Sequence, residues 1–116
     1  MAPDDSQSAD DRRRSPRAPV GDLQVGLRFD SVQQFLSAHA GDISESGMFV
    51  RMEKPEQHEV GQLVTLRFEA GKERIVQGTA RIARVDKGGI GLEFVELDAT
   101  SRKLIEMIVR IQLAAG

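Results

Sequence analysis

Apolar residues recur at every second position through much of the chain. Residues 23–28, 48–52 and 64–69 each show this alternation, and glycines or polar clusters separate them. A period of two is typical of β-strands with one buried side and one solvent-facing side. Residues 74–85 repeat the pattern over a longer stretch, and residues 35–43 show it more weakly. The spacing predicts a mostly β chain folded as an antiparallel sheet or barrel.

The last part of the chain changes from a strand pattern to a helical one. Asp98 is a good N-cap residue, and the apolar residues after it recur at helical spacing, which predicts a helix over residues 99–113. The apolar positions are Leu104, Ile105, Met107, Ile108, Val109, Ile111 and Leu113. Such a broad apolar face is either buried deeply against the barrel or partly exposed for contact with a partner. A homodimer formed through this helix would be one such contact.

The first 21 residues have no apolar periodicity. They are rich in Pro, Asp, Ser and Arg, and four aspartates precede the cluster of Arg12, Arg13, Arg14 and Arg17. Such a composition cannot bury enough apolar surface to order itself, so we expect a flexible basic arm over residues 1–21. The folded domain should then occupy residues 22–113.

Composition narrows the classes of function. The 116 residues include no cysteine, only two histidines and a net charge of −2. Disulfide scaffolds and thiolate metal sites are excluded, and no metal-ligand spacing is present, so we expect no metal and no cofactor. A broad basic face for DNA is absent, and aromatic residues make up only 4%, too few for a sheet that stacks RNA bases. No apolar run is long enough for export or membrane insertion, which favours a cytoplasmic protein.

Two motifs, separated along the chain, carry the functional interpretation. Residues 12–17 contain the pattern RRxxxR, and residues 42–47 contain DxSxxG between two predicted strands. Residues 89–94 add a Gly-x-Gly-hydrophobic-x-Phe pattern before the final helix. Together and in this order, they resemble the PilZ domain family over about residues 12–113. The resemblance implies a six-stranded antiparallel, split β-barrel with a C-terminal α-helix.

The same resemblance implies a non-catalytic receptor for the bacterial second messenger cyclic di-GMP, active in second messenger signalling and in motility regulation through an unidentified downstream protein. Arginine suits this ligand, because its planar fork binds phosphate and the O6/N7 edge of guanine and stacks on bases. The implied ligand-binding residues are Arg12, Arg13, Arg17, Asp42, Ser44 and Gly47, with Arg14 and Arg81 as secondary candidates. Asp42 would accept hydrogen bonds from guanine, the Ser44 hydroxyl would contact base or phosphate, and Gly47 would let the backbone approach the ligand.

Several alternatives stay open. A PilZ-like domain can keep the fold but act as a protein-interaction module with weak or no nucleotide binding. An enzyme is not expected, because His39, Asp42 and Ser44 are neighbours on one strand and turn and do not converge as a nucleophile and base must. Arg81 and Arg84 are either solvent-facing charges or ligand contacts. Aromatic stacking on guanine would need an exposed Phe35 or Phe49.

Overall fold

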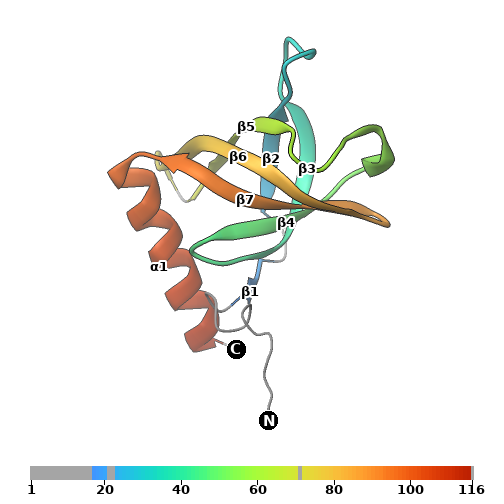
Figure 1. The fold of residues 1–116 in the computed structure, drawn as a ribbon. Helices are drawn as coiled ribbons and strands as arrows, with labels where there is room; N and C mark the ends of the chain where they lie inside the picture. The colour runs from blue at the N-terminus through green and yellow to red at the C-terminus, as the bar shows by residue number, and fades with distance from the viewer. Residues whose placement is uncertain (1–16, 21–22, 71, 116) are drawn as a thin grey trace.

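Six strands close into an antiparallel barrel within residues 17–20, 23–70 and 72–115, the part of the chain that this computed structural model describes (Figure 1). The strands follow one another around the barrel in the order β3-β2-β5-β6-β7-β4, and β4 pairs back with β3; β1 pairs with β3 outside the closed ring. The elements are β1 (Ala18–Pro19), β2 (Gln24–Arg28), β3 (Leu36–Ile43), β4 (Gly47–Arg51), η1 (Pro55–Gln57), β5 (Leu63–Glu69), β6 (Ile75–Asp86), β7 (Gly89–Leu97) and α1 (Ala99–Ala115). The predicted six-stranded barrel with a C-terminal helix is confirmed.

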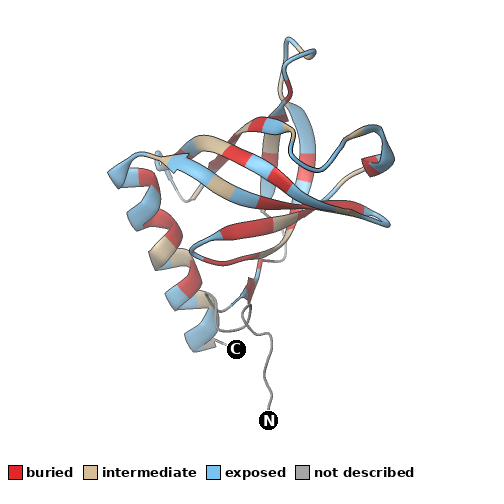
Figure 2. Ribbon diagram, in the orientation of Figure 1, coloured by how far each residue is buried: buried red, intermediate tan, exposed pale blue. Residues whose placement is uncertain are grey.

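The core of the barrel comes from the inward residues of the alternating strands. Leu27, Leu66 and Ile82 have no exposed surface, while their neighbours along each strand face solvent (Figure 2). Burying one aliphatic side chain of this size contributes about 1.5–3 kcal/mol, so the alternation alone specifies which face turns inward. Figure 2 shows buried residues as bands repeated along the strands.

β3 has the weakest alternation of the barrel strands because it contains an irregularity. Its pairing with β4 shifts register between Ala40 and Asp42, with Gly41 as the extra residue. A β-bulge of this kind re-aims the side chains that follow it. Here it leaves Asp42 partly exposed on the outer face and Ile43 fully buried.

The chain joins the sheet earlier than the arm predicted over residues 1–21 would allow. Ala18 pairs with Ile43 and Pro19 pairs with Asp42. The side chains of Ala18 and Val20 are buried, so residues 17–20 belong to the folded body. Residues 1–16 and 21–22 lie outside the described part, and the rest of the predicted arm stays a prediction.

α1 begins after a side-chain cap and covers part of the barrel. The amide of Ser101 donates to Asp98 Oδ1 at 2.7 Å, and this backbone hydrogen bond is the main reason why the pKa of Asp98 is lowered. The Ser101 hydroxyl in turn accepts from the amide of Gln77 on β6. The helix spans Ala99–Ala115, where the sequence predicted 99–113.

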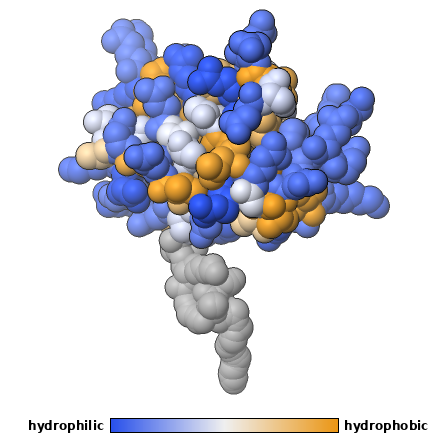
Figure 3. Space-filling model, turned by 45° about the horizontal axis from the view of Figure 1, so that its top comes forward, coloured by the Kyte–Doolittle hydropathy of each residue, from blue (hydrophilic) through white to orange (hydrophobic). Residues whose placement is uncertain are grey.

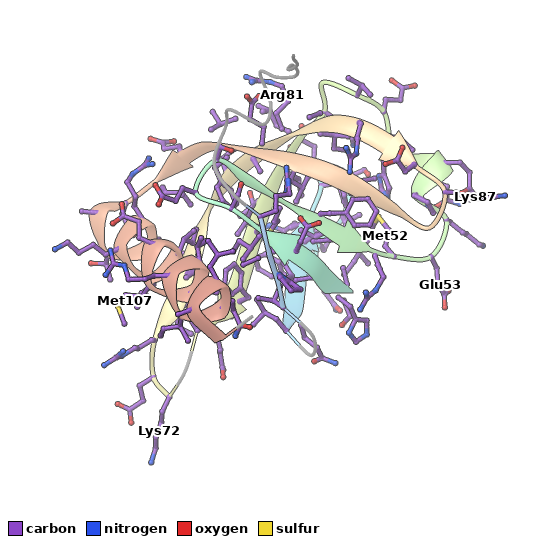
Figure 4. The ribbon with its side chains drawn as sticks, turned by 90° about the horizontal axis from the view of Figure 1, so that it is seen from below. Met52, Glu53, Lys72, Arg81, Lys87 and Met107 are labelled. Carbon is purple, nitrogen blue, oxygen red and sulfur yellow. The ribbon has the colours of Figure 1, made fainter. Side chains whose placement is uncertain are left out.

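The broad apolar face of α1 is partly buried and partly exposed. Leu104, Ile105 and Val109 are buried against the barrel. Met107 and Ile111 remain 39% and 58% exposed, and Met107 points away from the body in Figure 4. One side of the helix is therefore buried in the core, and apolar side chains on the other side remain exposed to solvent. A homodimer formed through this helix stays a prediction.

Candidate functional site

The DxSxxG segment forms the end of β3, a tight turn and the start of β4. Within the turn the amide of Ser44 donates to the carbonyl oxygen of Gly47 at 2.8 Å. The Ser44 hydroxyl accepts from the amides of Ser46 and Gly47, at 3.3 and 3.2 Å. Ser44 has no exposed surface. Its side chain therefore holds the turn together from inside, and the more exposed Asp42 and Ser46 face outward.

Gly47 is placed where a side chain does not fit. A methyl group at this position would collide with the backbone oxygen of Leu92 on β7, which a real Cβ atom cannot approach so closely. Gly47 pairs with Glu93, and the amide of Phe94 donates to the oxygen of Ser46 at 2.9 Å. The missing side chain lets β4 and the turn lie directly against β7.

Arg17 and Asp42, one from each sequence motif, meet on the outer face. The pairing of β1 with β3 puts Pro19 opposite Asp42, and Arg17 Nη1 then lies 2.7 Å from Asp42 Oδ1. The side chains are 47% and 34% exposed, so the ion pair contributes little stability but orients both groups. Arg12, Arg13 and Arg14, the other predicted arginines of the motif, lie outside the described residues.

A surface pocket of about 500 Å³ opens beside this ion pair. Gly47 on β4 and Gly91 on β7 line it, so no side chain from these two positions fills the pocket. The remaining lining residues are Arg17, Ser46, Ala83, Arg84, Leu92 and Glu93. Two arginines and one glutamate line it, and each arginine is also paired with an aspartate, Arg17 with Asp42 and Arg84 with Asp86. The volume suits a molecule of nucleotide size.

Arg81, a secondary candidate from the sequence, lies opposite Glu93 on the neighbouring strand. Its Nη1 is 3.7 Å from Glu93 Oε1, and both side chains are well exposed. Figure 4 shows Arg81 projecting away from the barrel. Arg81 does not line the pocket itself but contacts Glu93, which does.

Arg84 has a more specific environment than a freely solvated charge. Its Nε lies 2.8 Å from Asp86 Oδ2, and its guanidinium carbon lies 5.6 Å from the centre of the Phe49 ring. Sequence reasoning left Arg84 undecided and did not select Ser46, Gly91 or Glu93 as site residues. The Gly89-x-Gly91 pattern was a usable signal, because small residues on a strand expose backbone and let neighbouring side chains lie flat.

A second, larger groove lies on another part of the barrel. It has a volume of about 690 Å³ and includes Gly26, Phe35, His39, Arg67 and Glu69 among its lining residues. None of the predicted motif residues lines it. Two motif residues, Arg17 and Gly47, line the smaller pocket instead, and Asp42 is paired with Arg17 beside it.

Other classes of site find no support within the described residues. No group of three or more His, Asp or Glu side chains there lies close enough to hold a metal ion. No helix in the same residues is long and apolar enough to cross a bilayer. The face seen in Figure 3 is mostly hydrophilic, with its apolar side chains in small patches.

The chain matches the family model of the PilZ domain over residues 11–110. It belongs to the PilZ domain family. This match spans both sequence motifs, the whole barrel and most of α1. PilZ domains are generally non-catalytic binding domains, and the family binds cyclic di-GMP as a ligand.

Solved structures with the same fold are distant in sequence. The PilZ domain of YcgR from Escherichia coli, solved with cyclic di-GMP, has a TM-score of 0.72 and 15% identity over 90% of this chain and 93% of its own. The Bacillus subtilis inhibitor of motility MotI/DgrA has a TM-score of 0.75 and 19% identity, covering 90% of this chain. The present chain spans about half (53%) of MotI/DgrA. The PilZ domain of CeSA from a cellulose-synthesizing bacterium has a TM-score of 0.60 and 23% identity, over 83% of this chain and 96% of its own. No curated protein matches the sequence.

Proposed function

We propose that this PilZ domain is a non-catalytic receptor that binds cyclic di-GMP at the glycine-lined pocket beside Arg17 and Asp42. The observation that carries the proposal is the meeting of the two motifs, with Arg17 Nη1 2.7 Å from Asp42 Oδ1 at the pocket edge. Guanidinium and carboxylate then lie side by side, a donor for phosphate or guanine O6/N7 next to an acceptor for guanine N–H groups.

The proposal assigns different roles to the residues of the two motifs. Arg12, Arg13 and Arg17 bind the phosphates and guanine edges, with Arg14 and Arg81 as secondary contacts. Arg13 is four residues from Arg17, so their Cα atoms are at most about 14 Å apart, within reach of one ligand. Asp42 accepts from a guanine. Ser44 and Gly47 contribute through the turn they shape, since Ser44 is buried and Gly47 lies against β7.

The expected consequence of binding is a signal to a partner protein. MotI/DgrA is an inhibitor of motility, which supports motility regulation as the process for the present chain too. We propose a cytoplasmic protein that binds neither DNA nor RNA.

A second candidate function is a protein-interaction module with weak or no nucleotide binding. The exposed side chains of Met107, Ile111 and Leu113 on α1 favour it, because apolar groups that remain in solvent offer a surface to a partner or to a second copy of the chain.

Isothermal titration of the full chain with cyclic di-GMP, with GMP as the control ligand, separates the two. Saturable binding of the cyclic dinucleotide at micromolar or lower concentration, without binding of GMP, is the result that the receptor proposal predicts. A flat trace on folded protein contradicts it and leaves the interaction module.

A further inference from the structure

Phe49 does not line the proposed ligand pocket itself but lies beside it, next to the pocket residue Gly91. The chain has five phenylalanines and no Trp or Tyr. Phe29 and Phe68 are buried, and Phe94 packs against the core. Phe35 and Phe49 are half-buried, and Phe35 lines the groove away from the motifs. Phe49 instead pairs with Asp42 on one side and with Gly91 of the pocket on the other.

The ring of Phe49 lies across the sheet instead of standing out from it. Its Cε2 atom is 2.9 Å from the place where a Cβ on Gly89 of β7 would be, and its Cδ2 atom is 3.2 Å from the corresponding place on Gly41 of β3. The ring therefore fills the space that side chains at two glycines would occupy. Glycine backbone lies beneath the ring, and Phe49 remains partly exposed, with the Arg84 guanidinium carbon over the ring.

Arg84 extends this surface along the same row. Its stem lies over Gly91, with Cγ 3.0 Å from the place of a Cβ there. Asp86 holds Nε at 2.8 Å, and the guanidinium carbon is 5.6 Å from the centre of the Phe49 ring. The guanidinium is thus oriented by a carboxylate and an aromatic ring, which reduces the entropy that a ligand contact would cost.

Asp42, Phe49, Gly91 and Arg84 are successive partners across β3, β4, β7 and β6. Neighbouring strands lie about 4.8 Å apart, so the row spans roughly 14 Å, a length suited to a nucleotide. A purine lying over Phe49 would have Arg17 and Asp42 at one end of this row. Arg84 at the other end would then reach the O6/N7 edge of a guanine.

We propose that Phe49 stacks on a guanine of the bound ligand and that Arg84, positioned by Asp86, contacts the edge of the same base. This inference rests on the proposed cyclic di-GMP receptor function and adds a base-selecting surface to it. Stacking on an aromatic ring is worth about 1–3 kcal/mol per base, which corresponds to about 5- to 150-fold in affinity.

The test uses the absence of tryptophan from the chain. Phe49→Trp introduces a single indole, whose fluorescence should be quenched saturably by cyclic di-GMP as the base stacks on it. Phe35→Trp, the matched control on the other groove, should show no saturable change. Phe49→Leu keeps the apolar cover over the glycines but loses the aromatic face, so titration calorimetry should give affinity at least about fivefold weaker than wild type.

The outcomes of the test separate the stacking inference from the proposed receptor function. If wild type binds cyclic di-GMP, while the Phe49→Trp signal does not respond and Phe49→Leu binds as tightly as wild type, the stacking inference is overturned and the receptor function stands. If wild type does not bind, both are overturned. Quenching in Phe49→Trp alone, together with weaker binding by Phe49→Leu, supports both.

Discussion

Two parts of the outer surface have the same local packing but different surroundings. In each, a phenylalanine lies over glycine and a guanidinium carbon sits near the ring centre: Arg28 at 5.2 Å from Phe35, and Arg84 at 5.6 Å from Phe49. Around Phe49 the neighbours are Asp42 and Gly91, with Arg17 at the adjoining pocket. Around Phe35 they are groove residues outside both motifs.

Neither groove size nor aromatic packing sets the proposed ligand side apart from the other side. The groove beside Phe35 is the larger, at about 690 Å³ against about 500 Å³. What distinguishes the Phe49 side is the ion pair of Arg17 and Asp42, which joins the two sequence motifs. Arg17 and Asp42 come from segments 25 positions apart and converge there through the pairing of β1 with β3. A ligand with phosphates and guanines needs that combination.

The largest difference between the Phe49 side and the Phe35 side should appear in the binding of cyclic di-GMP. Replacing Arg13 and Arg17 together by Ala removes two charge-assisted contacts of about 1.5–3 kcal/mol each, so affinity for cyclic di-GMP should fall at least about 100-fold by calorimetry. Stability should change little, since these are surface substitutions. Arg67→Ala, the control in the Phe35 groove, should bind like wild type. An equal loss in Arg67→Ala would erase the distinction between the two sides.

Replacing one glycine by alanine on the Phe49 side, at Gly47, and one on the Phe35 side, at Gly26, should destabilise the domain to different degrees. At Gly47 the new methyl group meets the backbone oxygen of Leu92, and at Gly26 it meets the Phe35 side chain at 3.0–3.2 Å. Backbone yields less easily than a side chain, so we expect Gly47→Ala to cost about 3 kcal/mol and Gly26→Ala about 1 kcal/mol of unfolding free energy in urea titrations. A Gly47→Ala protein as stable as wild type would contradict the close contact of β4 with β7.

Ser44 tests whether the motif serine acts through the turn. Ser44→Ala removes the acceptor for the amides of Ser46 and Gly47, which should cost about 1–3 kcal/mol of stability by the same urea titration. Ser46→Ala, on the exposed side of the turn, should cost less than about 0.5 kcal/mol. If the two variants proved equally stable, the buried hydroxyl would not be holding the turn.

The smallest effect on cyclic di-GMP binding should come from Asp98, which lies on neither the Phe49 side nor the Phe35 side. The pKa of Asp98 is lowered mainly by the hydrogen bond from the Ser101 amide, so folding favours its ionised form. The stability that this charge adds is present above the unfolded-state pKa and is lost as pH falls through the lower folded-state pKa. The thermal midpoint of Asp98→Ala should lie below that of wild type at pH 7, and the gap should narrow below about pH 4. A gap that stays constant from pH 7 to pH 2 would contradict this assignment, and cyclic di-GMP binding at pH 7 should be unchanged.

Much of the fold follows from local patterns, whereas the site depends on strand register. The alternation of apolar and polar residues over 23–28 and 64–69 was enough to predict those strands. The N-cap residue Asp98 and the helical spacing of the apolar residues after it were enough to predict the helix. The joining of β1 to the sheet was not predictable, because Pro and Arg dominate that segment and only Ala18 and Val20 are buried.

The motif residues themselves were accessible from the sequence, but their partners were not. Arg17 and Asp42 were both selected, and the structure brings them into contact. Ser44 was selected as a surface contact, but its hydroxyl lies inside the turn, which depends on where β4 meets β7. The row from Asp42 through Phe49 to Arg84 exists only because a bulge at Gly41 and the pairing of β6 with β7 align those positions.

The most direct test of the central claim is a titration of the ¹⁵N-labelled chain with cyclic di-GMP, followed through its glycine amide resonances. The account predicts that Gly47 and Gly91, which line the pocket beside Arg17, shift progressively and saturate, while Gly26 in the Phe35 groove stays unchanged. Saturating shifts at Gly26 with Gly47 and Gly91 unmoved would place the ligand on the other side of the barrel and contradict the account.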